Sequence, residues 1–180
     1  DIGNWNGCGV YGSVIGGSNN ILSNNYYYKT NFDGINIWGG SSNIVSGNTI
    51  VACRRRGITV KQGASKNIIL ANRIADITAG GQWLPCGGGT TADPHGIYLG
   101  EESGTTDYNT DNNLVSANII SNSGANGLRL RYSSSNLIYS NIINEAGTSW
   151  GVGYSGMSLN VASDNNLISS NRIQDSSGSG

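Results

Sequence analysis

One six-residue pattern recurs along the chain and restricts what it can fold into. It consists of an Asn, two aliphatic residues, two variable residues and a second Asn, as in "NLIYSN". Its six copies begin at Asn20, Asn43, Asn67, Asn113, Asn136 and Asn166. A unit this short cannot bury its own apolar residues, so the copies must stack on one another.

A second pattern, a Gly followed by two apolar residues that flank a variable one, precedes the hexapeptide and predicts a short strand with one apolar face. It begins at Gly34, Gly57, Gly96, Gly127 and Gly156, and "GVYG" at Gly9 is interpreted as a degraded first copy. A third short strand follows the second Asn of each hexapeptide, as in "NTIVA" and "NRIAD". Each repeat therefore contains three short strands joined by polar turns.

Stacked repeats of this kind predict an all-β fold, a parallel β-helix (solenoid) of about six coils, with strands about 4.8 Å apart. We expect one domain over residues 1–180, as a module of a longer chain. The inward column should contain Ile35, Ile58, Ile97, Leu128 and Met157, and a ladder of turn amides should contain Asn43, Asn67, Asn136 and Asn166. The interval from Asn67 to Asn113 is twice a normal coil, which allows an extra coil or long loops; we prefer loops.

Composition excludes several classes of protein. Only 12% of the residues are charged and the net charge is −1, so no general basic field attracts nucleic acid. No apolar run is long enough for membrane insertion. Cys8, Cys53 and Cys86 have neither zinc-ligand nor disulfide-framework spacing, which leaves either free thiols or one bridge between Cys53 and Cys86.

Three insertions interrupt the repeat, and function tends to lie where regularity breaks. They are "AGGQWLPCGGGTTADPH" from Ala79, "EESGTTDYNTD" from Glu101 and "GTSWGVGYS" from Gly147. The first two flank the strand that opens at Gly96, and the third lies two coils away at the corresponding corner. All three should therefore border one face of the solenoid.

That face carries the outward residues of the first strand in each repeat. Two columns are expected, one of Asn36, Thr59, Tyr98, Arg129 and Ser158, and one of Trp38, Lys61, Gly100, Arg131 and Asn160. Trp83, Trp150 and Tyr154 lie on the bordering insertions. Aromatic rings stack on apolar sugar faces and Arg binds carboxylates, so this face suits an acidic polysaccharide. A solvated sheet face is the alternative.

His95 is the sole histidine, and it ends the longest insertion in "TADPHG". It is the side chain best suited to move protons near neutral pH, with Asp93 to orient it and Tyr98 nearby. An exposed turn after Asp-Pro is the alternative interpretation. For proton abstraction beside a uronate carboxylate, we assign Arg129 and Arg131 to the carboxylate, His95 or Lys61 to the base, and Tyr98 to the acid.

The repeats from Gly9 to Ile173 resemble the right-handed parallel β-helix proteins, which include polysaccharide lyases, epimerases, phage tailspikes and envelope proteins. The tripeptide "DPH", Asp93 to His95, is similar to the catalytic motif of mannuronan epimerases. That family carries a Tyr three residues before the Asp and a further Asp before a Gly on the next coil, where this chain has Thr90 and Asn126. The resemblance implies a right-handed helix and carbohydrate-active chemistry.

Two functions from different classes remain. The first is a secreted or cell-surface bacterial or archaeal enzyme that acts on an acidic polysaccharide by lyase- or epimerase-type proton abstraction. The second is a non-catalytic carbohydrate-binding or cell-envelope module, or a phage receptor-binding fragment. We expect no cofactor. A calcium site in the acidic loop from Glu101 to Asp111 is the alternative, although no EF-hand-like spacing supports it. Open solenoid ends are expected to contact other domains or copies.

Overall fold

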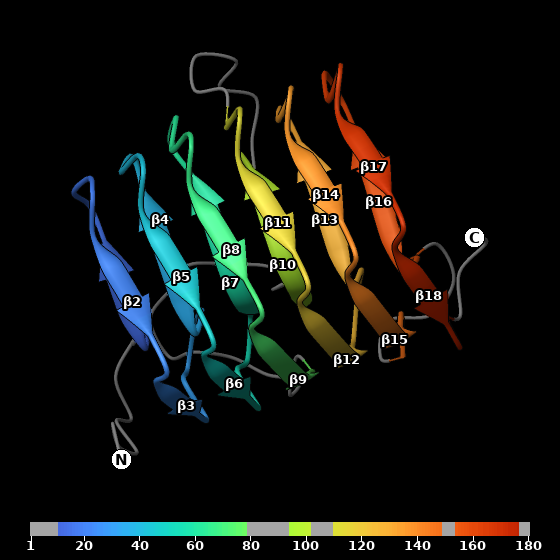
Figure 1. Ribbon diagram of the computed structural model, residues 1–180. Coiled ribbons are helices and arrows are strands. Elements are labelled where there is room, and N and C mark those ends of the chain that lie inside the picture. Colours follow the sequence, from blue (N-terminus) through green and yellow to red (C-terminus); the bar gives the residue numbers. More distant parts are fainter. Residues whose placement is uncertain (1–10, 79–93, 102–109, 149–153, 177–180) are drawn as a thin grey trace, which may run out of the picture.

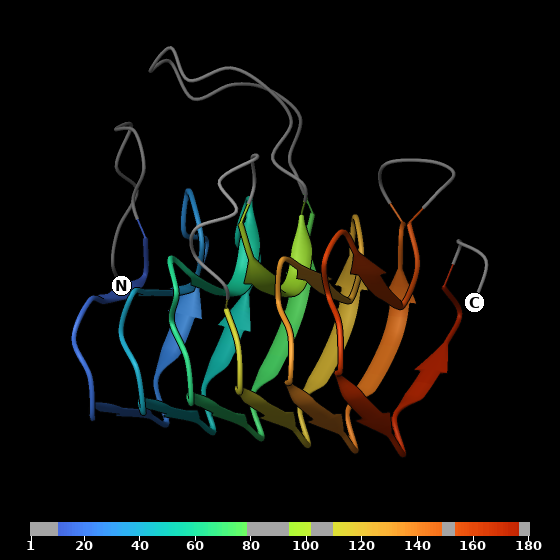
Figure 2. The ribbon, with the colours of Figure 1, turned by 90° about the horizontal axis from the view of Figure 1, so that it is seen from above.

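The computed structural model describes residues 11–78, 94–101, 110–148 and 154–176. In these ranges every regular element is a strand, and the strands form three parallel sheets of six strands each. Successive strands of the chain enter the three sheets in turn, so each three-strand repeat is one coil of a parallel β-helix (Figure 1). Seen from above, the coils stack in a row, with the first and the last described coil at opposite ends of it (Figure 2).

The sheets are named here A, B and C in the order in which each coil enters them. Sheet A contains β1 (Ser13–Ile15), β4 (Ile35–Trp38), β7 (Arg56–Lys61), β10 (His95–Gly100), β13 (Leu128–Arg131) and β16 (Met157–Asn160). Sheet B contains β2 (Ile21–Ser23), β5 (Ile44–Ser46), β8 (Ile68–Leu70), β11 (Leu114–Ser116), β14 (Leu137–Tyr139) and β17 (Leu167–Ser169). Sheet C contains β3 (Tyr26–Tyr28), β6 (Thr49–Val51), β9 (Arg73–Ile77), β12 (Ile119–Ser123), β15 (Ile142–Ala146) and β18 (Arg172–Gln174).

The predicted core column of sheet A is confirmed. Its members pair in register, in the order Ile35, Ile58, Ile97, Leu128 and Met157. The first four are fully buried, whereas Met157 is half-buried because it lies on the last coil. Register between coils is therefore set by the apolar residues that point into the solenoid.

The first coil differs from the prediction. Its sheet A strand is "SVI", Ser13–Ile15, which opens after Gly12, so the degraded copy proposed at Gly9 was wrong by three positions. The reason is steric: at each strand-opening position a side chain would overlap neighbouring atoms, so the position requires glycine. A Cβ on Gly96 would overlap Ile120 Cγ2 and the Gly127 carbonyl oxygen, and a Cβ on Gly12 would overlap Tyr27 and the Gly34 carbonyl oxygen. Gly12 thus occupies the equivalent position.

The Asn residues of the hexapeptide form two ladders. Asn43 Oδ1 accepts hydrogen bonds from the backbone N–H (2.8 Å) and Nδ2 (3.0 Å) of Asn20, and Asn43 donates the same pair to Asn67 Oδ1. The first ladder contains Asn20, Asn43, Asn67, Asn113, Asn136 and Asn166, and the second contains Asn25, Asn48, Asn72, Asn118, Asn141 and Asn171. Asn67 bonds directly to Asn113, and β8 pairs directly with β11, so no further coil lies between these two in the ladder or in sheet B.

Corner residues with positive φ precede the ladder positions, for example Ser42 (φ 58°) before Asn43 and Ala71 (φ 53°) before Asn72. This left-handed residue turns the chain between two sheets, and the Asn that follows ties the corner to the next coil. Each hexapeptide therefore contains one short strand of sheet B, and its two Asn residues are the ladder residues at the two ends of that strand.

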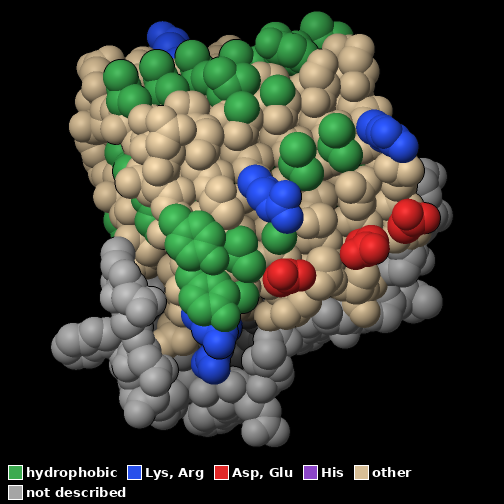
Figure 3. All heavy atoms as spheres, turned by 60° about the horizontal axis from the view of Figure 1, so that its bottom comes forward, with side chains coloured by type: hydrophobic (Ala, Val, Ile, Leu, Met, Phe, Trp, Pro, Cys, Tyr) green, Lys and Arg blue, Asp and Glu red, His purple; other side chains and the backbone are tan. Residues whose placement is uncertain are grey.

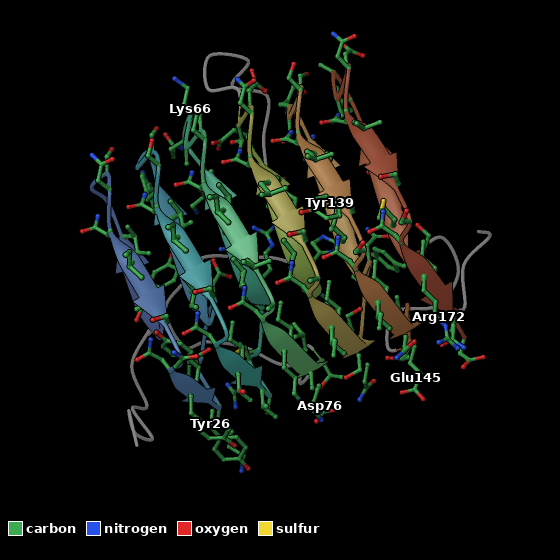
Figure 4. All side chains as sticks on the ribbon, viewed as in Figure 1. Tyr26, Lys66, Asp76, Tyr139, Glu145 and Arg172 are labelled. Atoms are coloured by element: carbon green, nitrogen blue, oxygen red, sulfur yellow. The ribbon has the colours of Figure 1, made fainter. Side chains whose placement is uncertain are left out.

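Sheet C presents an outer face with exposed aromatic residues on the first coil. Tyr26 and Tyr28 are 67% and 44% exposed, their rings lie 6.3 Å apart, and Lys29 Nζ lies 5.0 Å from the Tyr28 ring centroid. Figure 3 shows this face, with one hydrophobic cluster at its left, further hydrophobic side chains along the upper margin, and acidic side chains in a row at the lower right. The labelled side chains of Tyr26, Asp76 and Glu145 point away from the sheets (Figure 4).

Cys53 is a free, buried thiol, so the predicted alternative of a bridge to Cys86 is wrong. Burial raises the pKa of the Cys53 thiol to about 11, so it is protonated and unreactive near neutral pH. Cys8 and Cys86 lie outside the described residues. None of the described segments forms a helix long and apolar enough to cross a membrane.

Candidate functional site

The outer face of sheet A carries the two columns that the sequence predicted. Asn36 pairs with Thr59, Thr59 with Tyr98, and Tyr98 with Arg129 across β4, β7, β10 and β13. Trp38 pairs with Lys61, and Gly100 pairs with Arg131. Ser158 and Asn160 on β16 complete the two columns. The alternation of each strand therefore places these side chains on one surface.

A third polar column, which the sequence analysis missed, precedes the strand-opening glycines. It contains Asp33, Arg56, His95, Asn126 and Ser155. Arg56 pairs with His95, and backbone bonds from each following Gly to the next coil keep the column aligned. The signal was available in the sequence, because each of these polar residues stands directly before a Gly of the repeat.

His95 and Tyr98 form the centre of the site. Their rings are nearly parallel, with an interplanar angle of 11° and centroids 5.6 Å apart. Arg56 Cζ lies 3.9 Å from the Tyr98 ring centroid, and Arg129 Nη1 lies 3.2 Å from His95 Nε2. Side chains from three successive coils thus bring two guanidinium groups against one imidazole and one phenol.

Both ring nitrogens of His95 face donors. The backbone N–H of Asn126 donates to His95 Nδ1 (3.1 Å), and Arg129 Nη1 lies 3.2 Å from Nε2. Burial lowers the pKa of His95 well below its ordinary value, and the nearby Arg56 and Arg129 lower it further. The imidazole is therefore neutral near neutral pH.

The prediction that His95 faces an open groove was wrong, because its exposed fraction is 0%. A guanidinium only donates, so the contact between Arg129 Nη1 and His95 Nε2 holds the Arg129 side chain against the imidazole. A guanidinium carries five N–H donors, and it suits an acceptor oxygen such as that of a carboxylate.

Tyr98 is buried and protonated. Its hydroxyl donates to the Glu101 carbonyl oxygen (2.6 Å), and burial raises its pKa above the ordinary value. The Glu101 carboxylate accepts from Gln62, through the backbone N–H and through Nε2. The phenol of Tyr98 is therefore held inside β10, with its proton directed to the Glu101 carbonyl oxygen.

Lys61 and Trp38 form a cation–π pair beside this centre. Lys61 Nζ lies 4.2 Å from the Trp38 ring centroid, Lys61 is 8% exposed and Trp38 is 46% exposed. Burial lowers the pKa of Lys61, and Arg55 lowers it further. A lowered pKa is what a lysine needs to act as a general base. Trp38 contributes an accessible aromatic surface at the same place.

The other residues predicted to bind substrate belong to β13 or to the insertions of the repeat. Arg131 is half-buried on β13, with its Cζ 5.4 Å from the Tyr132 ring centroid. Tyr154 is half-buried, outside any strand, next to Ser155 of the third column. Asp93, Trp83 and Trp150 lie outside the described residues. The structure therefore brings His95, Tyr98 and Arg129 together, with Lys61 and Trp38 in the adjoining column.

No group of three or more His, Cys, Asp or Glu side chains suited to a metal ion occurs among residues 11–78, 94–101, 110–148 and 154–176. The polar groups at the described centre are mainly nitrogen donors. They suit an anion better than a metal cation.

Comparison with solved structures identifies similar folds. The periplasmic alginate epimerase AlgG is 18% identical with a TM-score of 0.54, over 93% of this chain and 43% of the epimerase chain. An alginate lyase from Paenibacillus sp. str. FPU-7 is 13% identical with a TM-score of 0.50, over 94% of this chain and 76% of the lyase chain. At these identities the likeness shows a shared fold, and this chain spans less than half of the epimerase.

A search of curated proteins found no match. The family described as "Right handed beta helix region" matches residues 1–92, just over half of the chain. The three parallel sheets and six coils agree with that architecture, including its right-handed sense. This chain therefore belongs to the right-handed β-helix family.

Proposed function

We propose that this protein binds an acidic polysaccharide on the outer face of sheet A and acts on its uronate units by lyase- or epimerase-type proton abstraction. The observation that carries the proposal is the Arg129 guanidinium on the outer face of sheet A, with its Nη1 3.2 Å from His95 Nε2 and its Cζ 6.0 Å from the Tyr98 ring centroid. A uronate carboxylate is the kind of acceptor that a guanidinium binds. The guanidinium also offsets its charge.

Both reactions begin when a base removes the ring proton next to the carboxylate, which shifts negative charge onto the carboxylate oxygens. Arg129, positioned by the neutral His95, stabilises that charge as it develops. Lys61 is assigned as the base and Tyr98 as the acid, in keeping with the directions of their pKa shifts. In elimination, the bond to the leaving sugar oxygen breaks and that oxygen is protonated; in epimerisation, a proton returns to the opposite ring face.

Alginate is the first substrate to test, because the solved structures of similar fold are an alginate epimerase and an alginate lyase. Alginate is a polyuronate, so every sugar unit offers a carboxylate to Arg129. The same comparison includes a periplasmic protein, and we propose an extracytoplasmic location for this chain.

A non-catalytic binding module is the second candidate function. One observation favours it: His95 and Tyr98 are only 0% and 1% exposed, so the central rings do not contact solvent in this structure. In that case the accessible Trp38 and the cations of sheet A would bind a chain without converting it.

Incubation with polymannuronate in deuterated water tests the catalytic proposal for both reactions. Lyase action produces unsaturated uronates that absorb in the ultraviolet, and epimerase action introduces deuterium at the epimerised carbon, which NMR detects. Lys61→Met should lower either signal by about a hundredfold or more, the usual scale for a positioned base. Binding of the polymer with neither signal would instead establish the binding module.

Binding is tested separately with a matched pair of aromatic variants. Trp38→Ala should weaken binding of an alginate oligosaccharide by about tenfold, since a stacked ring contributes on the order of 1 kcal/mol. Tyr26→Ala is the control, because Tyr26 is also exposed but lies on sheet C. Equal losses in the two variants would mean that sheet A is not the binding face.

A further inference from the structure

Three buried side-chain oxygens of the second and third coils lack hydrogen-bond partners. They are Asp33 Oδ1, Asn36 Oδ1 and Thr59 Oγ1, and all three residues are 0% exposed. The remaining groups of Asp33 and Asn36 are bonded to each other, since Asn36 Nδ2 donates to Asp33 Oδ2 (3.1 Å). Buried polar atoms are normally satisfied, so a cluster of three indicates a missing partner.

The chemistry of the cluster identifies the kind of partner. Carboxylate and amide oxygens only accept, and a threonine hydroxyl both accepts and donates, so the partner must supply donors. A cation is disfavoured, because Arg55, Arg56 and Lys61 already share this neighbourhood through charge–charge interactions with one another and with Asp33. An anion is disfavoured by the acceptor oxygens themselves. A neutral hydroxyl group satisfies the cluster.

We infer that Asp33, Asn36 and Thr59 form a subsite for sugar hydroxyl groups, next to the carboxylate-binding Arg129. The inference rests on the proposed function, and it adds the direction in which the polysaccharide lies on sheet A. Asn36, Thr59, Tyr98 and Arg129 are in register on four successive strands, so Asn36 and Arg129 are three steps, or about 14 Å, apart. That distance spans more than one sugar unit, so the polysaccharide lies across the strands and along the solenoid axis.

Access to the subsite requires movement of side chains that border it. Tyr11 and Phe32 lie next to this cluster in an edge-to-face pair with ring centroids 4.8 Å apart, and both are half-buried. Arg55 Cζ lies 4.4 Å from the Phe32 ring centroid. We therefore expect the side chains of Tyr11, Phe32 and Arg55 to move away from Asp33 when sugar hydroxyls bind.

Thr59→Val tests the subsite, because it removes the hydroxyl and keeps the shape. Loss of a buried hydroxyl without a partner should raise the melting temperature, whereas loss of a bond to sugar should weaken alginate oligosaccharide binding by about tenfold. Higher stability together with weaker binding is expected when a polar group serves the ligand and not the fold. Thr49→Val is the matched control, since Thr49 lies on the outer face of sheet C and should change neither quantity.

Salt separates this inference from the proposed function. The affinity lost in Thr59→Val should persist at high ionic strength, because the bond involves no charge on the ligand, whereas the loss in Arg129→Ala should shrink as salt screens the carboxylate. A raised melting temperature with unchanged affinity in Thr59→Val would mean that the cluster holds ordered water only, and would overturn the subsite alone. A lowered melting temperature would show that the hydroxyl has a protein partner, and would also overturn it. Wild-type protein that binds no alginate would remove the proposed function and the subsite with it.

Discussion

At the scale of single residues, the chemistry of the site depends on the hydrogen bond that His95 accepts. The N–H of Asn126 occupies Nδ1, and two guanidinium groups oppose a positive charge on the ring. Arg129 Nη1 also lies 3.2 Å from Nε2, so both ring nitrogens face donors from the next coil. We therefore expect His95 to act by positioning Arg129.

This role predicts different outcomes for two substitutions of His95. A Gln side chain keeps an acceptor for the donors that His95 faces, so His95→Gln should bind an alginate oligosaccharide within a few-fold of the wild type. His95→Ala should bind about tenfold more weakly, because both bonds are lost. Isothermal titration gives the affinities. If turnover falls about a hundredfold or more in His95→Gln as well, the imidazole itself transfers the proton and the positioning role is wrong.

The lowered pKa of His95 also predicts how stability depends on pH. The unfolded chain binds a proton near pH 6.5 and the folded chain does not, so the stability contribution is complete above about pH 6.5 and is lost as the pH falls toward the folded pKa. The free energy of unfolding should fall by about 1.4 kcal/mol per pH unit in that window. Denaturant titrations of the wild type and His95→Gln test this, and parallel pH profiles would contradict it.

At the scale of elements, each corner between sheets is tied to its neighbours by ladder amides. Asn136 shows the arrangement: its Oδ1 accepts from the backbone N–H (2.8 Å) and Nδ2 (3.2 Å) of Asn113, and its own Nδ2 donates to Asn166 Oδ1 (3.0 Å). One side chain thus joins three coils. Because Asn136 is only 1% exposed, water cannot replace these bonds.

Asn136→Ala should lower the free energy of unfolding by about 1–3 kcal/mol, because a buried N–H of Asn113 loses its acceptor. Asn20→Ala is the control: Asn20 is exposed on the first coil and donates to Asn43 without closing a bond to a preceding described coil. Chemical denaturation measures both. Similar losses in the two variants would show that position in the ladder has no energetic importance.

At the scale of the whole molecule, stability is distributed over contacts between adjacent coils, as expected for a solenoid. Ile138 and Ile168 pair in register on sheet B and point into the same column, yet Ile138 is 0% exposed and Ile168 is 37% exposed. The difference arises because Ile138 has coils on both sides. The last coil in the described chain leaves part of the core column accessible.

This asymmetry predicts unequal costs for the same substitution. Ile138→Ala should destabilise the protein by about 2–5 kcal/mol, the usual cost of truncating a fully buried Ile, because the neighbouring coils cannot close the cavity. Ile168→Ala should cost less than half as much, since part of its surface is already in contact with water. Thermal or denaturant unfolding of both variants would refute coil-by-coil stabilisation if the costs were equal.

The sequence by itself determined the coil, the ladders and the outward columns of sheet A. Those features repeat with a fixed spacing, and stacked parallel strands transmit that spacing from coil to coil, as the register of Asn36, Thr59 and Tyr98 shows. Tertiary structure alone decided the burial of His95, the place of Arg56 over Tyr98 and the unsatisfied oxygens of Asp33 and Asn36. The physical reason is that these properties depend on side chains from neighbouring coils, whose conformations and burial no repeat spacing specifies.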